Sequence, residues 1–267
     1  MSALSTVFEK AKSENRAVLI GYLPAGFPTQ ESSIEIIKAM IEGGVDAIEI
    51  GFPYSDPVMD GPVIQEAAET ARAAGITMKK TLEIVKETVK TGAPILMMTY
   101  WNPIEKYGVE KFADDFGAAG LEGLITPDLN FEEAETWLKA SEKNDLHRIF
   151  VVAPSTADGR LSEVVSHCSG FIYAASTMGV TGTRTTVSSA ADELVARLRG
   201  RTETPVAVGL GVSTGKQAAE IAQYADGVIV GSAFIKAIMA NPEDPIPAVK
   251  AIAQELARGV RGDYERI

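Results

Sequence analysis

Short runs of aliphatic and β-branched residues recur along this chain, and each is followed by a segment whose apolar residues repeat every three to four positions. The first pattern is typical of buried strands and the second of amphipathic helices. The predicted strands are 18–22, 45–51, 94–98, 121–126, 148–153, 170–174, 205–209 and 226–230. The helical spacing falls at 30–43, 62–74, 78–91, 109–118, 131–144, 159–167, 189–199, 214–223 and 243–258.

Strands that alternate with helices, without hairpin signals, predict a parallel sheet. Eight such units in about 250 residues fit a closed (β/α)8 (TIM) barrel, and we expect residues 1–267 to form it as one α/β domain. An open doubly wound sheet is the alternative, but residues 23–29 after the first strand contain no glycine-rich dinucleotide fingerprint. The amphipathic stretch 2–14 predicts an extra N-terminal helix that closes the N-terminal mouth of the barrel.

The composition narrows the class of protein. Apolar residues make up 46% of the 267, which suits a large core, and no low-complexity linker divides the chain. The longest apolar runs are strand-sized and the first residues lack the order of a signal peptide, so we expect a cytoplasmic protein without membrane insertion. The single Cys168 excludes an internal disulfide, and the net charge of -11 opposes binding to nucleic acid.

Two carboxylates flank the turn-rich segment that follows the second strand. Glu49 lies near the end of an apolar run, where burial would disfavour its charged form and raise its pKa towards neutral pH. Asp60 lies in the long loop after the same strand and can fold back over the mouth of the barrel. This pair is suited to proton transfer; a Glu49 satisfied by a neighbouring amide is the alternative.

Other polar and aromatic residues follow the ends of predicted strands, where the active sites of barrels gather. Tyr22, Tyr100, Asp128 and Tyr173 lie at or just after such ends. Together they predict a pocket with aromatic walls and few polar groups, although each alone is more commonly a packing residue.

Three loops of one chemical type follow the last three strands, at 178–183, 209–214 and 231–233. Their glycines allow close approach of the backbone, and the helix N-termini that follow present free N–H groups and a positive dipole end. Loops in these positions commonly form a phosphate site in barrels, so we expect an anion there. The alternative is that the glycines serve only tight turns.

The residue types that are absent from the predicted strands limit the possible chemistry. No lysine falls inside a predicted strand, which disfavours a Schiff-base aldolase. His147 is expected at the opposite face of the barrel and His167 at a helix end, so neither a histidine-ligated metal nor a Ser/His triad can be assembled. We therefore expect no metal and no cofactor, and the remaining groups suit proton transfer on a phosphorylated substrate.

Five motifs occur in an order that resembles the tryptophan synthase alpha chain family over essentially the whole length. They are residues 21–26, 49–65, 179–182, 209–212 and 230–232. The block 49–65 is the most specific, because the glycine loops alone would fit many phosphate-binding barrels.

The resemblance implies a reversible retro-aldol cleavage of indole-3-glycerol phosphate to indole and glyceraldehyde 3-phosphate. It implies that Glu49 is the general acid and base and that Asp60 hydrogen-bonds the indole N–H. It further implies that Tyr173 shapes the reaction centre while Tyr22, Tyr100 and Asp128 line the indole pocket. The phosphate would be held by Gly182, Gly211, Gly231 and Ser232.

The resemblance also implies a partner, a pyridoxal-phosphate beta chain that receives indole through an internal passage in an alpha2beta2 complex. Residues 53–60, 177–188 and Asn102–Pro103 would then be lid or docking elements. Thr177 departs from the family pattern, because many members carry an arginine after the serine at this point.

Two rival functions stay open at this stage. Another phosphosugar barrel enzyme, such as an isomerase of histidine biosynthesis or a thiamine-phosphate synthase, would share the glycine loops. Such an isomerase would want an aspartate where Tyr22 and Leu23 stand. The other rival is a binding or activating subunit that holds the phosphate ligand but catalyses little by itself.

Overall fold

The computed structural model describes residues 1–175, 189–209 and 211–263. Its eight strands are parallel and pair in chain order, and β8 pairs back with β1, so the sheet closes into a barrel. The strands are β1 (Val18–Pro24), β2 (Ala47–Gly51), β3 (Ile95–Met98), β4 (Gly123–Thr126), β5 (His147–Val152), β6 (Ile172–Ala175), β7 (Val206–Gly209) and β8 (Gly227–Val230). The predicted barrel is confirmed, and each strand lies within two residues of its predicted bounds.

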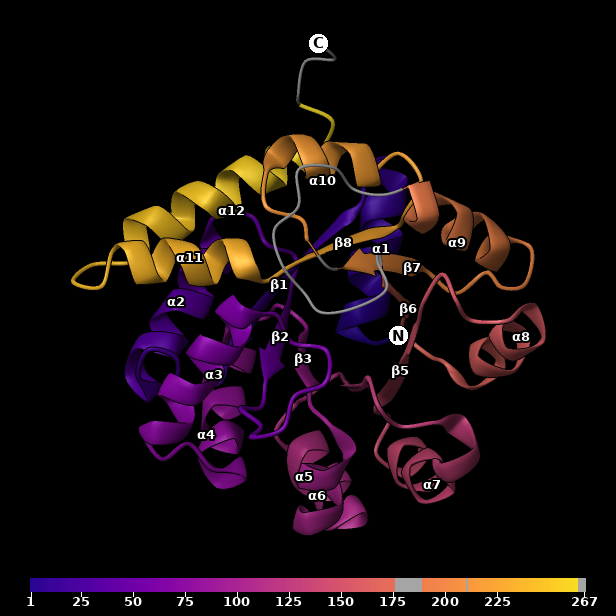
Figure 1. Cartoon of the computed structure of the whole chain (residues 1–267), viewed down its shortest axis with the longest axis horizontal. Helices are drawn as coiled ribbons and strands as arrows, with labels where there is room; N and C mark the ends of the chain where they lie inside the picture. Colours follow the sequence, from indigo (N-terminus) through magenta and orange to yellow (C-terminus); the bar gives the residue numbers. More distant parts are fainter. Residues whose placement is uncertain (176–188, 210, 264–267) are drawn as a thin grey trace.

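Helices surround the barrel as an outer ring (Figure 1). The helices of this ring are α2 (Gln30–Glu42), α3 (Pro62–Ala73), α4 (Met78–Thr88), α5 (Trp101–Tyr107), α6 (Val109–Ala118), α7 (Glu135–Lys143), α8 (Asp158–His167), α9 (Ser189–Arg199), α10 (Gly215–Ile221), α11 (Ser232–Ala240) and α12 (Ile246–Val260), whereas α1 (Ala3–Ser13) lies across the N-terminal mouth. Short 3-10 turns at Val89–Thr91 and Phe131–Glu133 complete them. Helices α5 and α11 are additions to the sequence prediction.

The barrel has two hydrophobic cores because successive side chains of a strand point to opposite faces. In β2, Ala47 belongs to the interior core, whereas Ile48 and Ile50 pack outwards against the helices. Glu49 follows the same alternation as Ala47 and therefore points into the barrel, fully buried. A charged residue is thus held inside by the register of the strand.

Helix α1 closes the N-terminal mouth, as predicted. Leu4, Phe8 and Ala11 are buried in the interior core. The Glu122 carboxylate accepts hydrogen bonds from the N–H groups of Ala3 and Leu4, at 3.3 and 3.1 Å. His147, at the start of β5, lies at this end, where its Nε2 is 2.9 Å from the Ser2 Oγ.

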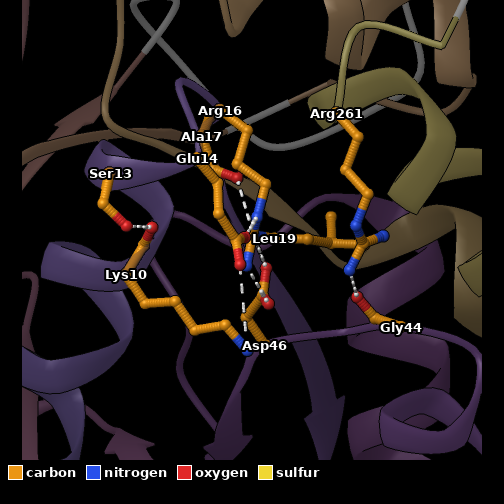
Figure 2. A network of polar contacts seen from close by, with 9 residues as sticks. All are labelled: Lys10, Ser13, Glu14, Arg16, Ala17, Leu19, Gly44, Asp46 and Arg261. Carbon is orange, nitrogen blue, oxygen red and sulfur yellow. Dashed lines mark hydrogen bonds and ion pairs between the residues drawn. The ribbon is translucent and has the colours of Figure 1, made fainter.

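A partly buried ion pair holds the segment between α1 and β1 against the start of β2 (Figure 2). The Arg16 guanidinium donates to both oxygens of Asp46, at 2.8 and 3.0 Å, and its Nε donates to Glu14 at 2.6 Å. Asp46 also accepts the Leu19 N–H at 2.9 Å. The polar network of this mouth therefore keeps α1 in place.

No helix within the described part of the chain is both long and apolar enough to span a membrane.

Candidate active site

A small cavity lies among the C-terminal ends of the strands, where the sequence predicted the site. Its free volume is about 40 Å³, little more than the space of a water molecule. Its lining consists of Tyr22, Glu49, Met59, Asp60, Ile64, Met98, Tyr173, Gly211, Val212, Ile229, Gly231 and Ser232. Residues from the loop after β2 thus cover a space whose floor is formed by β1, β2, β3, β6 and β8.

A larger hollow of about 510 Å³ lies at the opposite mouth, beside Phe8 of α1 and Asp226 at the start of β8. It contains none of the predicted site residues. Active sites of this fold lie at the C-terminal ends of the strands. The smaller cavity is therefore the candidate for chemistry.

Glu49 is the most perturbed carboxyl of the cavity. Its side chain is 0% exposed, and among the described residues neither of its oxygens has a hydrogen-bond partner. Burial disfavours the carboxylate and raises the pKa of Glu49 to about 8. No amide among the described residues hydrogen-bonds to Glu49, so that alternative does not hold. With a pKa of about 8, the carboxyl of Glu49 is protonated at neutral pH.

Asp60 lies on the loop between β2 and α3. Burial raises its pKa to about 6, while a hydrogen bond from Tyr100 works in the opposite direction. The Tyr100 hydroxyl also accepts the Met59 N–H at 3.0 Å, which holds the loop beside Asp60. At neutral pH the cavity thus contains one protonated and one ionised carboxyl, the division of roles that acid–base catalysis needs.

Tyr22 and Tyr173 form aromatic walls of the cavity. Tyr22 is paired in register with Glu49 on the neighbouring strand, and both tyrosines are buried. Burial raises the pKa of each hydroxyl well above its usual range, and nearby carboxyls add to this effect. The hydroxyls therefore stay protonated and can donate hydrogen bonds to a ligand.

Tyr100 and Asp128 do not line the cavity. The Asp128 carboxylate accepts the Trp101 N–H with both oxygens, at 2.9 and 3.1 Å, and so caps the start of α5. Tyr100 is the residue just before this helix. In the structure the two residues hold α5 and the loop that carries Asp60, and their contact with a substrate stays a prediction.

The opposite end of the cavity is suited to an anion. Gly231 precedes α11 without a side-chain cap, the first turn of α11 has no acidic residue, and Ser232 is its first residue. Gly211 has a φ of 91°, a conformation that glycine adopts most readily. Free N–H groups at a helix N-terminus bind phosphate. Gly182 and the segment 177–188, with Thr177, lie outside the described residues.

Sequence reasoning missed five apolar lining residues: Met59, Ile64, Met98, Val212 and Ile229. Met98 is the last residue of β3, so its position at a strand end was a usable signal. The others lie on loops, on a helix or deep in the barrel, where no pattern distinguishes a pocket wall from ordinary core.

Barrels that combine an acid–base carboxyl pair with an anion site are enzymes acting on phosphorylated substrates, and fold and site together indicate that class. Residues 8–261 match the family model for the tryptophan synthase alpha chain. The chain belongs to the tryptophan synthase alpha chain family.

Curated relatives and solved structures agree with this assignment. The alpha chain of Salinispora arenicola is 55% identical over 263 residues, and that of Thermobifida fusca 54% over 266, each alignment covering 98% of both chains. A chain of Mycobacterium tuberculosis tryptophan synthase is 51% identical, with a TM-score of 0.92 over 97% of this chain and 98% of that one. The alpha chain of Legionella pneumophila is 30% identical, with a TM-score of 0.89 over 100% of both.

Proposed function

We propose that this protein is the alpha subunit of a tryptophan synthase and cleaves indole-3-glycerol phosphate reversibly to indole and glyceraldehyde 3-phosphate. We place it in the cytoplasm and take residues 1–267 as one barrel domain. The observation that carries the proposal is the buried pair of carboxyls with different pKa values, Glu49 at about 8 and Asp60 at about 6. Membership in the alpha chain family selects the substrate among those that such a pair could serve.

Glu49 acts first as an acid in this mechanism. Its carboxyl transfers a proton to the indole carbon that bears the glycerol side chain, and positive charge develops on the ring nitrogen. The Asp60 carboxylate accepts the hydrogen bond of the ring N–H and stabilises that charge. A protonated Glu49 and an ionised Asp60 are the states that neutral pH provides.

Glu49 then acts as a base. The new carboxylate takes the proton from the hydroxyl on the side-chain carbon attached to the ring. The bond between that carbon and the ring breaks, its electrons return to the indole, and the carbon becomes the aldehyde of glyceraldehyde 3-phosphate. Glu49 ends protonated, so the cycle neither consumes nor releases a proton.

The walls of the cavity position the two halves of the substrate. Tyr22 and Tyr173 lie beside the indole, with Tyr100 and Asp128 holding the adjoining helix and loop. The phosphate lies at the N-terminus of α11, on Gly211, Gly231 and Ser232, with Gly182 as a further predicted ligand. Because the free volume is about 40 Å³, binding requires the cavity to widen.

The proposed partner is a pyridoxal-phosphate beta chain in an alpha2beta2 complex. The Asn102 amide donates to the Tyr54 hydroxyl at 3.0 Å, and the Tyr54 ring lies 5.3 Å from that of Tyr100. A partner that contacts Asn102 could thus act on the loop that carries Asp60 through packed side chains.

Release of indole from indole-3-glycerol phosphate, measured with and without a beta chain, tests the function. We expect slow cleavage by the isolated chain and a gain of roughly 5- to 150-fold in the complex, the range of typical coupling energies. Absence of cleavage in both samples would favour the rival function, a subunit that binds the phosphate ligand without catalysis.

A further inference from the structure

Tyr22 lies between two glycines at the C-terminal ends of the neighbouring strands, one in β2 and one just after β8. Strand β1 pairs with β2 on one side and β8 on the other. Gly51 is the last residue of β2, and Gly231 directly follows β8. A Cβ at Gly51 would lie 2.2 Å from the Tyr22 hydroxyl oxygen and 2.5 Å from its Cζ; at Gly231, a Cβ would lie 3.0 Å from Cδ1. The phenol ring therefore fills the place of a side chain at Gly51.

The backbone of Gly51 gives no other reason for glycine. Gly51 is absent from the glycines with positive φ, so an L-residue could adopt its conformation. Its place in the sheet is fixed, because it pairs in register with Pro24 and Met98 and its carbonyl accepts the Ala25 N–H at 2.8 Å. A methyl group added at Gly51 must consequently displace the Tyr22 ring and not the strand.

The cavity beside the ring offers space to a displaced ring. Tyr22 is 9% exposed, and its ring borders the cavity with Glu49 and Asp60. On the side of β8 the ring also lies close to Gly231, since a Cβ built there would meet Cδ1 of the ring at 3.0 Å. Movement of the ring away from both glycines and into this cavity would bring it into the space that the substrate must occupy.

We propose that Gly51 is a positioning residue that sets the width of the indole pocket by leaving its Cβ position to the ring of Tyr22. The geometry of the two residues stands on the structure alone, whereas the effect on an indole substrate rests on the proposed function. The residue is outside the cavity lining and touches no reacting atom. It acts through Tyr22.

The test is a double-mutant cycle of Gly51→Ala and Tyr22→Leu, read as kcat and KM for indole-3-glycerol phosphate and for its analogue methylated on the benzene ring. A misplacement of about 1 Å can cost about 100-fold. We expect Gly51→Ala to lose at least roughly 10-fold in kcat/KM, with a larger loss for the methylated analogue. In the Tyr22→Leu background the same change should cost less than about 2-fold, because the shorter side chain leaves room for the methyl group.

Gly159→Ala is the matched control, because a Cβ at this glycine of α8 would meet no atom within 4 Å. It should retain wild-type kcat and KM. If Gly51→Ala does not fold, the single variant Tyr22→Leu provides the test. The space left by the tyrosine ring should raise kcat/KM for the methylated analogue relative to that for indole-3-glycerol phosphate. An unchanged ratio overturns the inference.

The outcomes separate the two proposals. If the wild type cleaves the substrate and Gly51→Ala lowers kcat/KM by the same factor in both backgrounds, the role of Gly51 is contradicted. The proposed function then stays intact. A wild type that cleaves neither substrate, with or without a beta chain, contradicts the proposed function and this inference with it.

Discussion

Replacing Glu49 with glutamine should stabilise the fold at alkaline pH, although it removes the proposed catalytic acid. The folded chain holds the proton of Glu49 up to a pKa of about 8, whereas the ordinary value is 4.5. Below pH 4.5 both states are protonated and burial of the carboxyl adds no charge penalty. Between pH 4.5 and 8 only the unfolded chain ionises, so the stability of the folded state falls as the pH rises.

The size of the effect follows from the gap between the two pKa values. Each pH unit is worth about 1.4 kcal/mol, so the full penalty above pH 8 is about 5 kcal/mol. At pH 5 only about 1 kcal/mol of it is present. Glutamine is neutral at every pH and nearly the same size. The advantage of Glu49→Gln over the wild type should therefore grow by about 4 kcal/mol between pH 5 and pH 8.5.

Urea unfolding at both pH values, followed by circular dichroism, measures this difference. The measured quantity is the difference in free energy of unfolding between variant and wild type, compared at the two pH values. Contributions of ionisable groups that both proteins share cancel in this difference. Glu66→Gln, at an exposed glutamate of α3, is the control and should change stability by less than about 0.5 kcal/mol at either pH. If Glu49→Gln is more stable than the wild type by the same amount at pH 5 and pH 8.5, burial does not raise the pKa of Glu49.

Three further predictions concern the surroundings of the pair, the anion end and the opposite mouth. Tyr100→Phe removes a hydrogen bond that lowers the pKa of Asp60, so the acid limb of the kcat profile should move to higher pH; an unmoved limb would contradict this. Gly211→Asp places a charged side chain at a φ of 91° beside the anion end, and calorimetry should show at least about 10-fold weaker binding of glycerol phosphate; unchanged affinity would contradict the phosphate site. Asp46→Ala removes the two-oxygen acceptor of the partly buried Arg16 and leaves it Glu14 and the Ala17 carbonyl, so urea unfolding should show a loss of about 1 to 3 kcal/mol; a loss under about 0.5 kcal/mol would contradict this.

The sequence predicted the barrel because its signal is local. A parallel strand buried on both faces reads as an apolar run, and each run here is followed by helical spacing. The two helices that were missed lack that spacing. Helix α5 has only seven residues and contains Pro103, whereas α11 is apolar on nearly every side, with Phe234, Ile235 and Ile238 buried.

The site was predictable only in part. The burial of Glu49 was predictable because it is a charged residue in an apolar strand. The anion site that the glycine loops indicate stays a prediction. The partners of Asp128 could not be read from the chain, because its carboxylate caps a helix that begins 27 residues earlier. The contact between Gly51 and Tyr22 was equally hidden, since it depends on the rotation of one ring across two paired strands.

Cleavage of indole-3-glycerol phosphate by Glu49→Gln, in the presence of a saturating beta chain, tests whether Glu49 is the acid and base of the reaction. The amide keeps the shape of the side chain but transfers no proton. General acid–base catalysis contributes roughly 10²- to 10⁴-fold, and Glu49 acts in two steps, so we predict a loss of at least about 100-fold in kcat with glycerol phosphate binding unchanged. A Glu49→Gln protein that keeps more than about a tenth of the wild-type rate would contradict the assignment of Glu49 as the acid and base.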